Sequence, residues 1–527
     1  MITPVDILGV NGSIAKRLEN YELRKEQLAM SEAVNRAFIK KQHLLVEAGT
    51  GVGKSFAYLI PAILQTAGNQ KDDSSTNKSS ANNVTINNTP IKSVVPSNKS
   101  STDCNVKYDI PFDINYSPDS FDLLPDLSDQ IDNEVSYQFD RQVSKTDFPR
   151  VIISTHTISL QEQIMEKDIP FLRSVLPFEF TAVLVKGRSN YVCLRRFYAV
   201  SQKLNTLWDD FQQREFEHLH DWIKKTEDGS KSSLIPEPAW EIWAEICCET
   251  GNCTGKICKW NDKCFYNKTR RRIVNAQILI VNHALFFSDL MLRMQSGGIL
   301  PTYNMLVFDE AHTIEQVASE HIGISVTQYQ VEYNLNRLYN EHTQKGLLMN
   351  SNFSNKNNNN EIDTIGEKKK KNEYNYTTEF EELRKIVIDC LTRSDIFFGD
   401  LIDWIKQHSG GNGRVRKAGS FRNNLSEGLS KLTEHLRRII EKLPDAGERQ
   451  EFRSARDKII SIRDSIDLWV NQQIPDESVY WIEVKTTSRG KLRVSINASP
   501  IDIGPILREH LFGKIQSIVM TSATLTT

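Results

Sequence analysis

A glycine-rich segment close to the N-terminus constrains the fold of this chain most strongly. It follows the apolar run 44–46, precedes a helix-compatible stretch, and reads Glu47-Ala48-Gly49-Thr50-Gly51-Val52-Gly53-Lys54-Ser55. Glycines let backbone N–H groups turn towards phosphate oxygens, and the N-terminus of the following helix adds partial positive charge. In such a loop Lys54 reaches the β- and γ-phosphates and Ser55 holds Mg2+. The segment therefore predicts a Walker A loop that binds ATP through residues 49–55, with Ala48 where the strict pattern has glycine.

A second motif lies at the end of another apolar run, in Leu306-Val307-Phe308-Asp309-Glu310-Ala311-His312. Phosphoryl transfer needs in-line positioning and charge neutralisation more than covalent chemistry. We expect Asp309 to hold Mg2+ through water and Glu310 to orient the water that attacks the γ-phosphorus. Together with the phosphate loop, this motif predicts an ATP-hydrolysing site whose catalytic residues are Lys54, Asp309, Glu310 and His312.

A weaker signal for nucleotide recognition precedes the loop, in Tyr21-Glu22-Leu23-Arg24-Lys25-Glu26-Gln27. Gln27 can offer a donor and an acceptor to the adenine edge, and Tyr21 or Arg24 can stack on the ring. The alternative is that these are ordinary exposed polar residues of a helix. We expect Gln27 and Arg24 to contact the nucleotide.

Short apolar runs of strand length recur along the chain and predict an α/β fold. Helix-like stretches separate several of them, and unbroken apolar runs are typical of strands buried on both faces of a parallel sheet. In open sheets of this kind, ligands bind at the carboxyl ends of the strands, which is where both motifs lie. The runs are 44–46, 151–153, 183–185, 278–281, 306–308 and 518–520.

Two polar stretches interrupt this pattern. Residues 69–147 are rich in Ser and Asn and lose apolar periodicity, which predicts a mostly disordered insertion. Residues 350–378 predict a second, shorter one. Between 380 and 470 the apolar residues recur at helical spacing, so we expect a helical domain there.

Charge and hydropathy exclude several classes of protein. The chain has 65 Lys and Arg against 67 Asp and Glu, a net charge of -2. It is therefore not a uniformly basic coat protein, and any nucleic-acid surface must be local. No apolar run reaches the roughly 18 residues that indicate a membrane helix, and the start at Met1 lacks the build of a signal peptide. We expect a soluble, cytoplasmic protein with no membrane partner.

Four of the eight cysteines are spaced like metal ligands. Cys193 stands alone, and Cys253, Cys258 and Cys264 follow after a long interval. Four thiolates can hold Zn2+ or an iron-sulfur cluster, but structural zinc usually uses closely spaced pairs, so the spacing leans towards iron and sulfur. Zinc and unliganded thiols remain the alternatives. Basic and aromatic residues are interleaved around these cysteines, which suits either a single-strand nucleic-acid path or a solvated basic face.

In combination and order, these motifs resemble the DinG branch of the XPD-like superfamily 2 helicases. The resemblance also includes the segment Thr521-Ser522-Ala523-Thr524-Leu525, and it covers nearly the whole chain outside the polar insertions. It implies an ATP-dependent DNA helicase of 5′ to 3′ polarity that acts on single-stranded and forked DNA in repair or replication. It also implies a 4Fe-4S cluster held by Cys193, Cys253, Cys258 and Cys264.

The resemblance further implies a division into domains and a set of residues that contact DNA. A RecA-like motor domain would hold an inserted iron-sulfur domain at 187–272 and an inserted helical Arch domain at 320–475. The motor domain itself would comprise residues 1–186, 273–319 and 476–527. The strand end formed by Ser154, Thr155 and His156 would face the DNA backbone. The closing segment formed by Ser522, Ala523 and Thr524 would couple nucleotide state to DNA binding.

The chain departs from the family pattern in two places. The insertion at 69–147 is tolerable as an exposed linker, because the entropy of loop closure grows slowly with length. The chain stops at Thr527, where the family continues into a second RecA-like domain whose arginines complete the ATP site, and such a cation can be worth about 10³ to 10⁵ in rate. We therefore expect this chain alone to bind nucleotide and single-stranded DNA but to unwind poorly, unless another chain supplies that domain. The alternative is a nucleotide-gated or redox-sensing DNA-binding module without unwinding activity.

Overall fold

The computed structural model describes most of the chain. The described residues are 2–49, 51–67, 148–202, 210–249, 251–294, 297–349, 377–408, 412–443, 446–474, 477–486 and 492–524. The insertion expected at 69–147, nearly all of the stretch 350–378, Thr50 and Cys104 lie outside these residues. Among the described helices, none is long and apolar enough to cross a membrane.

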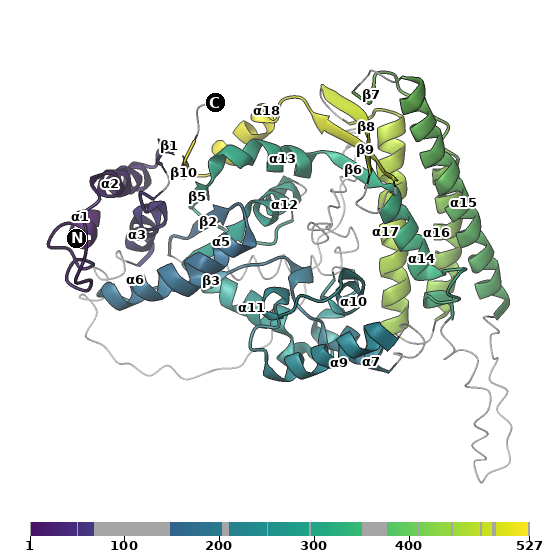
Figure 1. Cartoon of the computed structure of the whole chain (residues 1–527), viewed down its shortest axis with the longest axis horizontal. Helices are drawn as coiled ribbons and strands as arrows, with labels where there is room; N and C mark the ends of the chain where they lie inside the picture. Colours follow the sequence, from purple (N-terminus) through teal and green to yellow (C-terminus); the bar gives the residue numbers. More distant parts are fainter. Residues whose placement is uncertain are drawn as a thin grey trace, which may run out of the picture.

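The phosphate loop and the acidic motif both lie at strand ends of a six-stranded sheet (Figure 1). Its strands are β1 (Leu44–Glu47), β2 (Val151–Thr155), β3 (Ala182–Leu184), β4 (Ile278–Asn282), β5 (Met305–Asp309) and β10 (Ser517–Ser522). Their order is β1-β10-β5-β2-β4-β3, and every neighbouring pair is parallel. Strands β2 and β5 are buried along their whole length, as expected where helices cover both faces. The predicted α/β fold with a parallel sheet is confirmed.

Alternate residues of each strand enter two hydrophobic cores, one on each face of the sheet. In β2, Ile153 belongs to the first core and Ile152 to the second. The first core contains residues of α1 (Pro4–Leu8), α2 (Lys25–Lys40), α3 (Lys54–Ala67), the π-helical turn η3 (Ile164–Asp168) and α6 (Ile169–Val175). The second contains residues of α12 (His283–Met294), α13 (Ile314–Ile322) and α18 (Gly504–Leu507). Helix α5 (Ile158–Gln163) directly follows β2. This packing holds the carboxyl ends of β1, β5 and β10 at one edge of the sheet.

Residues 188–274, between β3 and β4, form a smaller unit with a core of its own, here called the cysteine-rich unit. Its apolar side chains include Phe197 and Phe216, whose rings stack with centroids 4.6 Å apart. Short turns carry the cysteine-bearing stretch between the helices. The elements are α7 (Leu194–Ser201), α9 (Asp210–Lys225), α10 (Trp240–Ile246), η6 (Gly255–Ile257), η7 (Asn261–Lys263) and α11 (Phe265–Val274).

The described residues between 324 and 500 form a third part, here called the helical unit, in which three long helices pack side by side against a small antiparallel sheet (Figure 1). The sheet has the order β6-β9-β8-β7. The elements are β6 (Ile324–Thr327), α14 (Gln328–Leu338), α15 (Thr377–Gln407), β7 (Arg414–Val415), α16 (Asn424–Lys442), α17 (Ala446–Val470), β8 (Ser478–Thr486) and β9 (Leu492–Pro500). The helical spacing predicted between 380 and 470 is therefore found in α15, α16 and α17.

Strands β8 and β9 differ from the sequence-based expectation, which assigned all of 476–527 to the motor domain. Both strands belong to the antiparallel sheet, and the chain returns to the parallel sheet only at β10. The physical reason lies in their pattern. In β8, Tyr480 and Ile482 are buried while the residues between and after them are partly exposed, which is typical of a half-buried antiparallel strand and not of a strand covered on both faces.

Candidate functional site

The phosphate loop connects the end of β1 to the start of α3 at the carboxyl edge of the sheet. Gly51 and Gly53 have φ angles of +84° and +85°, a backbone conformation that side chains with a Cβ rarely adopt. A Cβ on Gly53 would lie 2.2 Å from the Gln27 amide nitrogen, so the Gln27 side chain would have to move away from the loop. The loop therefore has the turn geometry that the glycine pattern predicts, with Thr50 outside the described residues.

The structure brings the loop and the acidic motif together. The Lys54 ammonium lies 3.2 Å from a carboxylate oxygen of Glu310. The phenol of Tyr58, one turn further along α3, donates a hydrogen bond of 2.9 Å to Asp309. Burial raises the pKa of Asp309, and the hydrogen bond from Tyr58 opposes that rise. A cation and two carboxylates thus meet next to the phosphate loop, as a site for a metal-bound triphosphate requires.

Glu310 has a strained backbone, and its neighbour His312 reaches the next strand. Glu310 has a φ of +53°, in the left-handed region, which a non-glycine residue keeps only where its surroundings hold it there. His312 Nδ1 lies 2.8 Å from the Ser522 hydroxyl at the end of β10. The acidic motif is therefore in direct contact with the segment Ser522–Thr524, of which Ser522 is buried and Thr524 exposed.

Arg24 and Gln27 lie against the phosphate loop. Arg24 donates a hydrogen bond of 2.6 Å to the carbonyl of Gly51, and the Gln27 amide donates one of 2.9 Å to the carbonyl of Gly53. Tyr21 instead bonds the carbonyl of Leu8 through its hydroxyl. Both residues predicted to read adenine are thus next to the loop, and their contact with a base remains a prediction.

Of the three residues expected to face DNA from the end of β2, only His156 is exposed. Ser154 and Thr155 are fully buried, because a strand covered on both faces buries its side chains up to its last residue. Ser154 is in contact with His283, and Thr155 donates a hydrogen bond to the carbonyl of Thr157. Of these three residues, His156 is therefore the one whose side chain is accessible to DNA. Ser154 and Thr155 are buried and pack inside the carboxyl end of β2.

Sequence reasoning missed two residues at the magnesium side of the site. Tyr58 contacts Asp309, and Asp168 at the end of η3 is a hydrogen-bond partner of Ser55. Burial raises the pKa of Asp168, and the Ser55 hydroxyl opposes the rise. Tyr58 lies four residues after Lys54 and thus on the same helix face, a spacing that gives a usable sequence signal. Asp168 comes from a distant segment and gives none.

The four predicted metal ligands lie in the cysteine-rich unit outside any disulfide, each partly exposed. Cys193 begins α7, Cys258 follows η6 and Cys264 precedes α11. Burial raises the pKa of Cys193 and of Cys264, and Cys253 acts electrostatically on both. Within the described residues, no group of three or more His, Cys, Asp or Glu has metal-binding geometry. The metal site therefore stays a prediction, supported by three thiols that act on one another.

Aromatic and basic side chains pair directly around these thiols. The rings of Tyr198 and Trp260 stack with centroids 4.5 Å apart, and Lys259 lies over Trp260 at 5.5 Å. Arg188 lies over the ring of Tyr266 at 4.7 Å. These contacts hold the cysteine-bearing turns against α7 and α11. They also show that several aromatic faces already have partners, which weakens the interpretation of this surface as a ready stacking path for bases.

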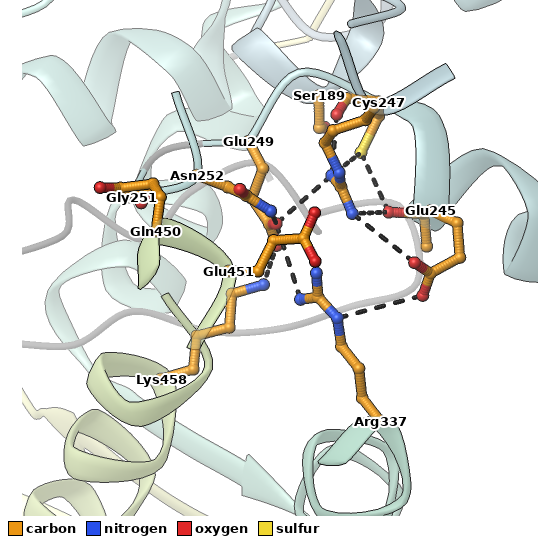
Figure 2. A network of polar contacts seen from close by, with 12 residues as sticks. Ser189, Glu245, Cys247, Glu249, Gly251, Asn252, Arg337, Gln450, Glu451 and Lys458 are labelled. Carbon is orange, nitrogen blue, oxygen red and sulfur yellow. Dashed lines mark hydrogen bonds and ion pairs between the residues drawn. The ribbon is translucent and has the colours of Figure 1, made fainter. Parts of the chain in front are cut away.

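A network of ion pairs joins the cysteine-rich unit to the helical unit (Figure 2). The carboxylate of Glu249 lies 3.3 Å from Arg196 of α7 and 3.6 Å from Arg337 of α14, and it also pairs with Lys458 of α17. On the same loop, the Gly251 carbonyl accepts a hydrogen bond from Gln450 of α17. The loop that leads into Cys253 is therefore fixed by contacts from both units.

Comparisons with known proteins find similar helicases. Residues 244–331 match the family model described as DEAD_2. The chain is 26% identical over 329 residues to "ATP-dependent DNA helicase YoaA" of Haemophilus influenzae, and 31% identical over 186 residues to "ATP-dependent DNA helicase DinG" of Photobacterium profundum. It is also 22% identical over 543 residues to "3'-5' exonuclease DinG" of Bacillus subtilis. This chain is similar to the DinG-type helicases.

The DinG-type resemblance inferred from the motifs is thereby confirmed, over part of each relative. The three matches cover 62%, 32% and 98% of this chain but 38%, 26% and 47% of the relatives, in the order YoaA, the Photobacterium protein and the Bacillus protein. The chain thus spans less than half the length of these curated relatives. A solved structure titled "XPD_Helicase" aligns with 96% of this chain and 59% of its own, at 13% identity and a TM-score of 0.42.

Proposed function

We propose that this chain is the ATP-driven motor part of a DinG-type DNA helicase. The observation that carries the proposal is the 3.2 Å contact between Lys54 and Glu310, which are 256 residues apart in sequence and meet at the carboxyl edge of the parallel sheet. A basic side chain from a phosphate loop beside the general-base carboxylate of an acidic motif is the arrangement that nucleotide hydrolysis needs. The names of the Haemophilus and Photobacterium relatives support the same activity.

In this proposal the residues exchange partners when nucleotide binds. Lys54 leaves Glu310 for the β- and γ-phosphates, because a triphosphate carries more negative charge than one carboxylate. Glu310 is then free to orient the attacking water. Asp309 and Ser55 hold Mg2+, which neutralises charge on the phosphates, and Tyr58 keeps Asp309 in place through its hydrogen bond.

Nucleotide binding would be coupled to DNA binding through the strand ends next to Glu310. His312 contacts Ser522, so a shift of the acidic motif also moves the segment that ends at Thr524. His156 offers an exposed side chain at the end of β2, and β2 is the neighbour of β5. These contacts support a role of this edge in gripping single-stranded DNA.

For the cysteines we propose a 4Fe-4S cluster held by Cys193, Cys253, Cys258 and Cys264. Thiolates are the donors that iron-sulfur clusters require, and Cys193, Cys253 and Cys264 already act on one another electrostatically. The cluster would cross-link the turns of the cysteine-rich unit and supply redox chemistry when bound. Zinc in the same thiolates is the competing assignment, and iron quantification separates the two.

Three finer points complete the proposal: 5′ to 3′ polarity, a preference for single-stranded or forked DNA, and work in DNA repair or replication. Cations that complete the γ-phosphate site would come from a second motor domain, carried by the same polypeptide or by another chain. If residues 1–527 are tested without such a domain, we expect ATP turnover to be slow and unwinding to be weak.

The test compares Lys54→Ala with Lys40→Ala, an exposed lysine at the end of α2. Nucleotide affinity is measured by calorimetry, and ATP hydrolysis is measured with and without single-stranded DNA. We expect Lys54→Ala to lower nucleotide affinity by about a hundredfold, because it removes a charge-assisted contact to phosphate, and Lys40→Ala to change nothing. Hydrolysis stimulated by DNA supports the motor. Nucleotide binding without turnover supports a gated DNA-binding module, and equal affinity in the two variants contradicts the proposal.

A further inference from the structure

His283 is a fully buried histidine between the two motifs, and none of the functional contacts described above explains it. It is the first residue of α12, directly after β4, and is 0% exposed. The side-chain oxygen of Asn282 accepts a hydrogen bond of 2.9 Å from the backbone N–H of Leu285, which caps the helix and fixes its first turn. The backbone position of His283 is therefore well determined.

One ring nitrogen of His283 holds the end of β2. Its Nδ1 lies 2.7 Å from the hydroxyl of the buried Ser154. The His156 ring lies 6.2 Å away, centroid to centroid, and is the exposed residue of the same strand end. A displacement of the His283 ring would therefore shift Ser154 directly and His156, two residues further along the chain, indirectly.

The other side of the His283 ring lies next to the acidic motif. Nε2 is buried and makes no hydrogen bond of ordinary geometry within the described residues, yet the backbone of Asp309 and of Glu310 is close enough to oppose, by hydrogen bonding, the lowering of the pKa of the ring by burial. The ring also packs edge-on against Phe308 at 5.7 Å. A neutral imidazole has one donor and one acceptor nitrogen. If the Ser154 hydroxyl donates to Nδ1, Nε2 carries the proton and points at backbone carbonyls.

A buried nitrogen without a hydrogen bond of ordinary geometry and a strained neighbouring residue make the contact between His283 and the acidic motif able to change. A buried polar group without a partner is costly, and Glu310 keeps its left-handed backbone only while its surroundings hold it. Thr313 donates to the Glu310 carbonyl through its N–H and its hydroxyl, and Lys54 pairs with the Glu310 carboxylate. When Lys54 turns to phosphate, Glu310 loses that ion pair, and the backbone of Asp309 and Glu310 can shift relative to Nε2.

We propose that His283 is a positioning residue that transmits the state of the Asp309-Glu310 backbone to the strand end at Ser154 and His156. This inference rests on the proposed function, because it needs nucleotide to move the acidic motif. It adds a path on the β2 side of the sheet to the contact between His312 and Ser522 on the β10 side. The transmitted quantity is a coupling free energy between two sites, which a variant can remove without removing either site.

The experiment is hydrogen exchange of the full chain with and without Mg2+ and a non-hydrolysed ATP analogue. In the unaltered chain we expect nucleotide to change the exchange of three segments, residues 51–58, 305–313 and 151–157. His283→Asn retains a polar group near the position of Nδ1 but lacks Nε2. We expect it to keep the first two changes and to reduce the change at 151–157 at least fivefold.

Two further variants keep the test decisive. His321→Asn is the matched control, because His321 of α13 is also buried and also has a ring nitrogen without a partner among the described residues. It should leave all three changes intact. Ser154→Ala removes the hydroxyl that contacts His283 Nδ1, and it should reduce the change in exchange at 151–157 as His283→Asn does. In unfolding experiments, Ser154→Ala and His283→Asn should combine non-additively, by about threefold or more in the equilibrium constant.

The outcomes separate this inference from the proposed function. If nucleotide leaves residues 51–58 unchanged in the unaltered chain, the proposed function fails and the coupling role fails with it. If residues 51–58 and 305–313 respond while 151–157 does not, the function stands and the role of His283 is refuted. An undiminished response at 151–157 in His283→Asn, or an equal loss in His321→Asn, also refutes it.

Discussion

The nucleotide site and the cysteine-rich unit hold their proposed ligands by different means. In the nucleotide site, the donors come from consecutive residues of one loop and from the ends of neighbouring strands, so backbone geometry places them. In the cysteine-rich unit, four thiols come from separate turns, and the loop before Cys253 is fixed by side chains of another unit. A site of the first kind follows from local sequence, whereas one of the second kind depends on tertiary contacts and on the metal itself.

The largest effect is expected from removing one proposed cluster ligand. Cys264→Ser should lower the iron content of anaerobically purified protein from about four per chain to below one, because a cluster needs all its thiolates. Cys390→Ser, in a fully buried thiol of α15 outside the cysteine-rich unit, is the control and should keep the iron. Iron retained in Cys264→Ser, or stoichiometric zinc in the unaltered chain, would contradict the cluster.

The next effect concerns the ion pairs that support the cysteine-bearing loop. Glu249 is 12% exposed and faces Arg196, Arg337 and Lys458, so Glu249→Gln leaves three cations without their shared carboxylate. We expect the free energy of unfolding to fall by about 3 kcal/mol, measured by urea denaturation. Glu427→Gln, in an ion pair whose carboxylate is 80% exposed, should cost less than about 0.5 kcal/mol. Equal effects would show that the network does not stabilise the loop.

A smaller effect is expected from the hydrogen bond to Asp309. Tyr58→Phe removes a bond that favours the ionised carboxylate, so the pKa of Asp309 rises further above its ordinary value. Mg2+ needs the ionised form, and its binding is therefore lost as pH falls through that pKa, at a higher pH in the variant. We expect Mg2+-nucleotide affinity near neutral pH to fall about tenfold. Tyr21→Phe, which removes a hydroxyl bonded to Leu8, is the control for calorimetry across pH. Identical pH profiles would exclude this role of Tyr58.

The smallest effect concerns the choice of base. Gln27→Ala removes the amide that contacts the phosphate loop and that we expect to read adenine. The ratio of ATP to GTP affinity should fall about fivefold, the contribution of one neutral hydrogen bond. Gln42→Ala, an exposed residue after α2, should keep the ratio. If Gln27→Ala weakens ATP and GTP equally, Gln27 supports the loop and does not select the base.

The sequence predicted what depends on neighbouring residues and missed what depends on distant ones. The glycines of the phosphate loop and the acidic motif at the end of an apolar run follow from local patterns. The left-handed backbone of Glu310 and the contact between Asp168 and Ser55 depend on segments far apart in the chain. The family resemblance implies that Ser154 faces DNA from a strand end, but the layers on both faces of the sheet bury it.

The place of β10 in the sheet has a consequence for biosynthesis. This strand lies between β1 and β5, and the hydroxyl of Ser517 bonds the carbonyl of Gln42 across a separation of 475 residues. On the ribosome, β1 therefore emerges long before the only strand that separates it from the rest of the sheet. Until β10 arrives, the edge of β5 is open, so the nascent motor must be shielded from pairing with other chains. The proposed nucleotide site can therefore be completed only after β10 has been synthesised.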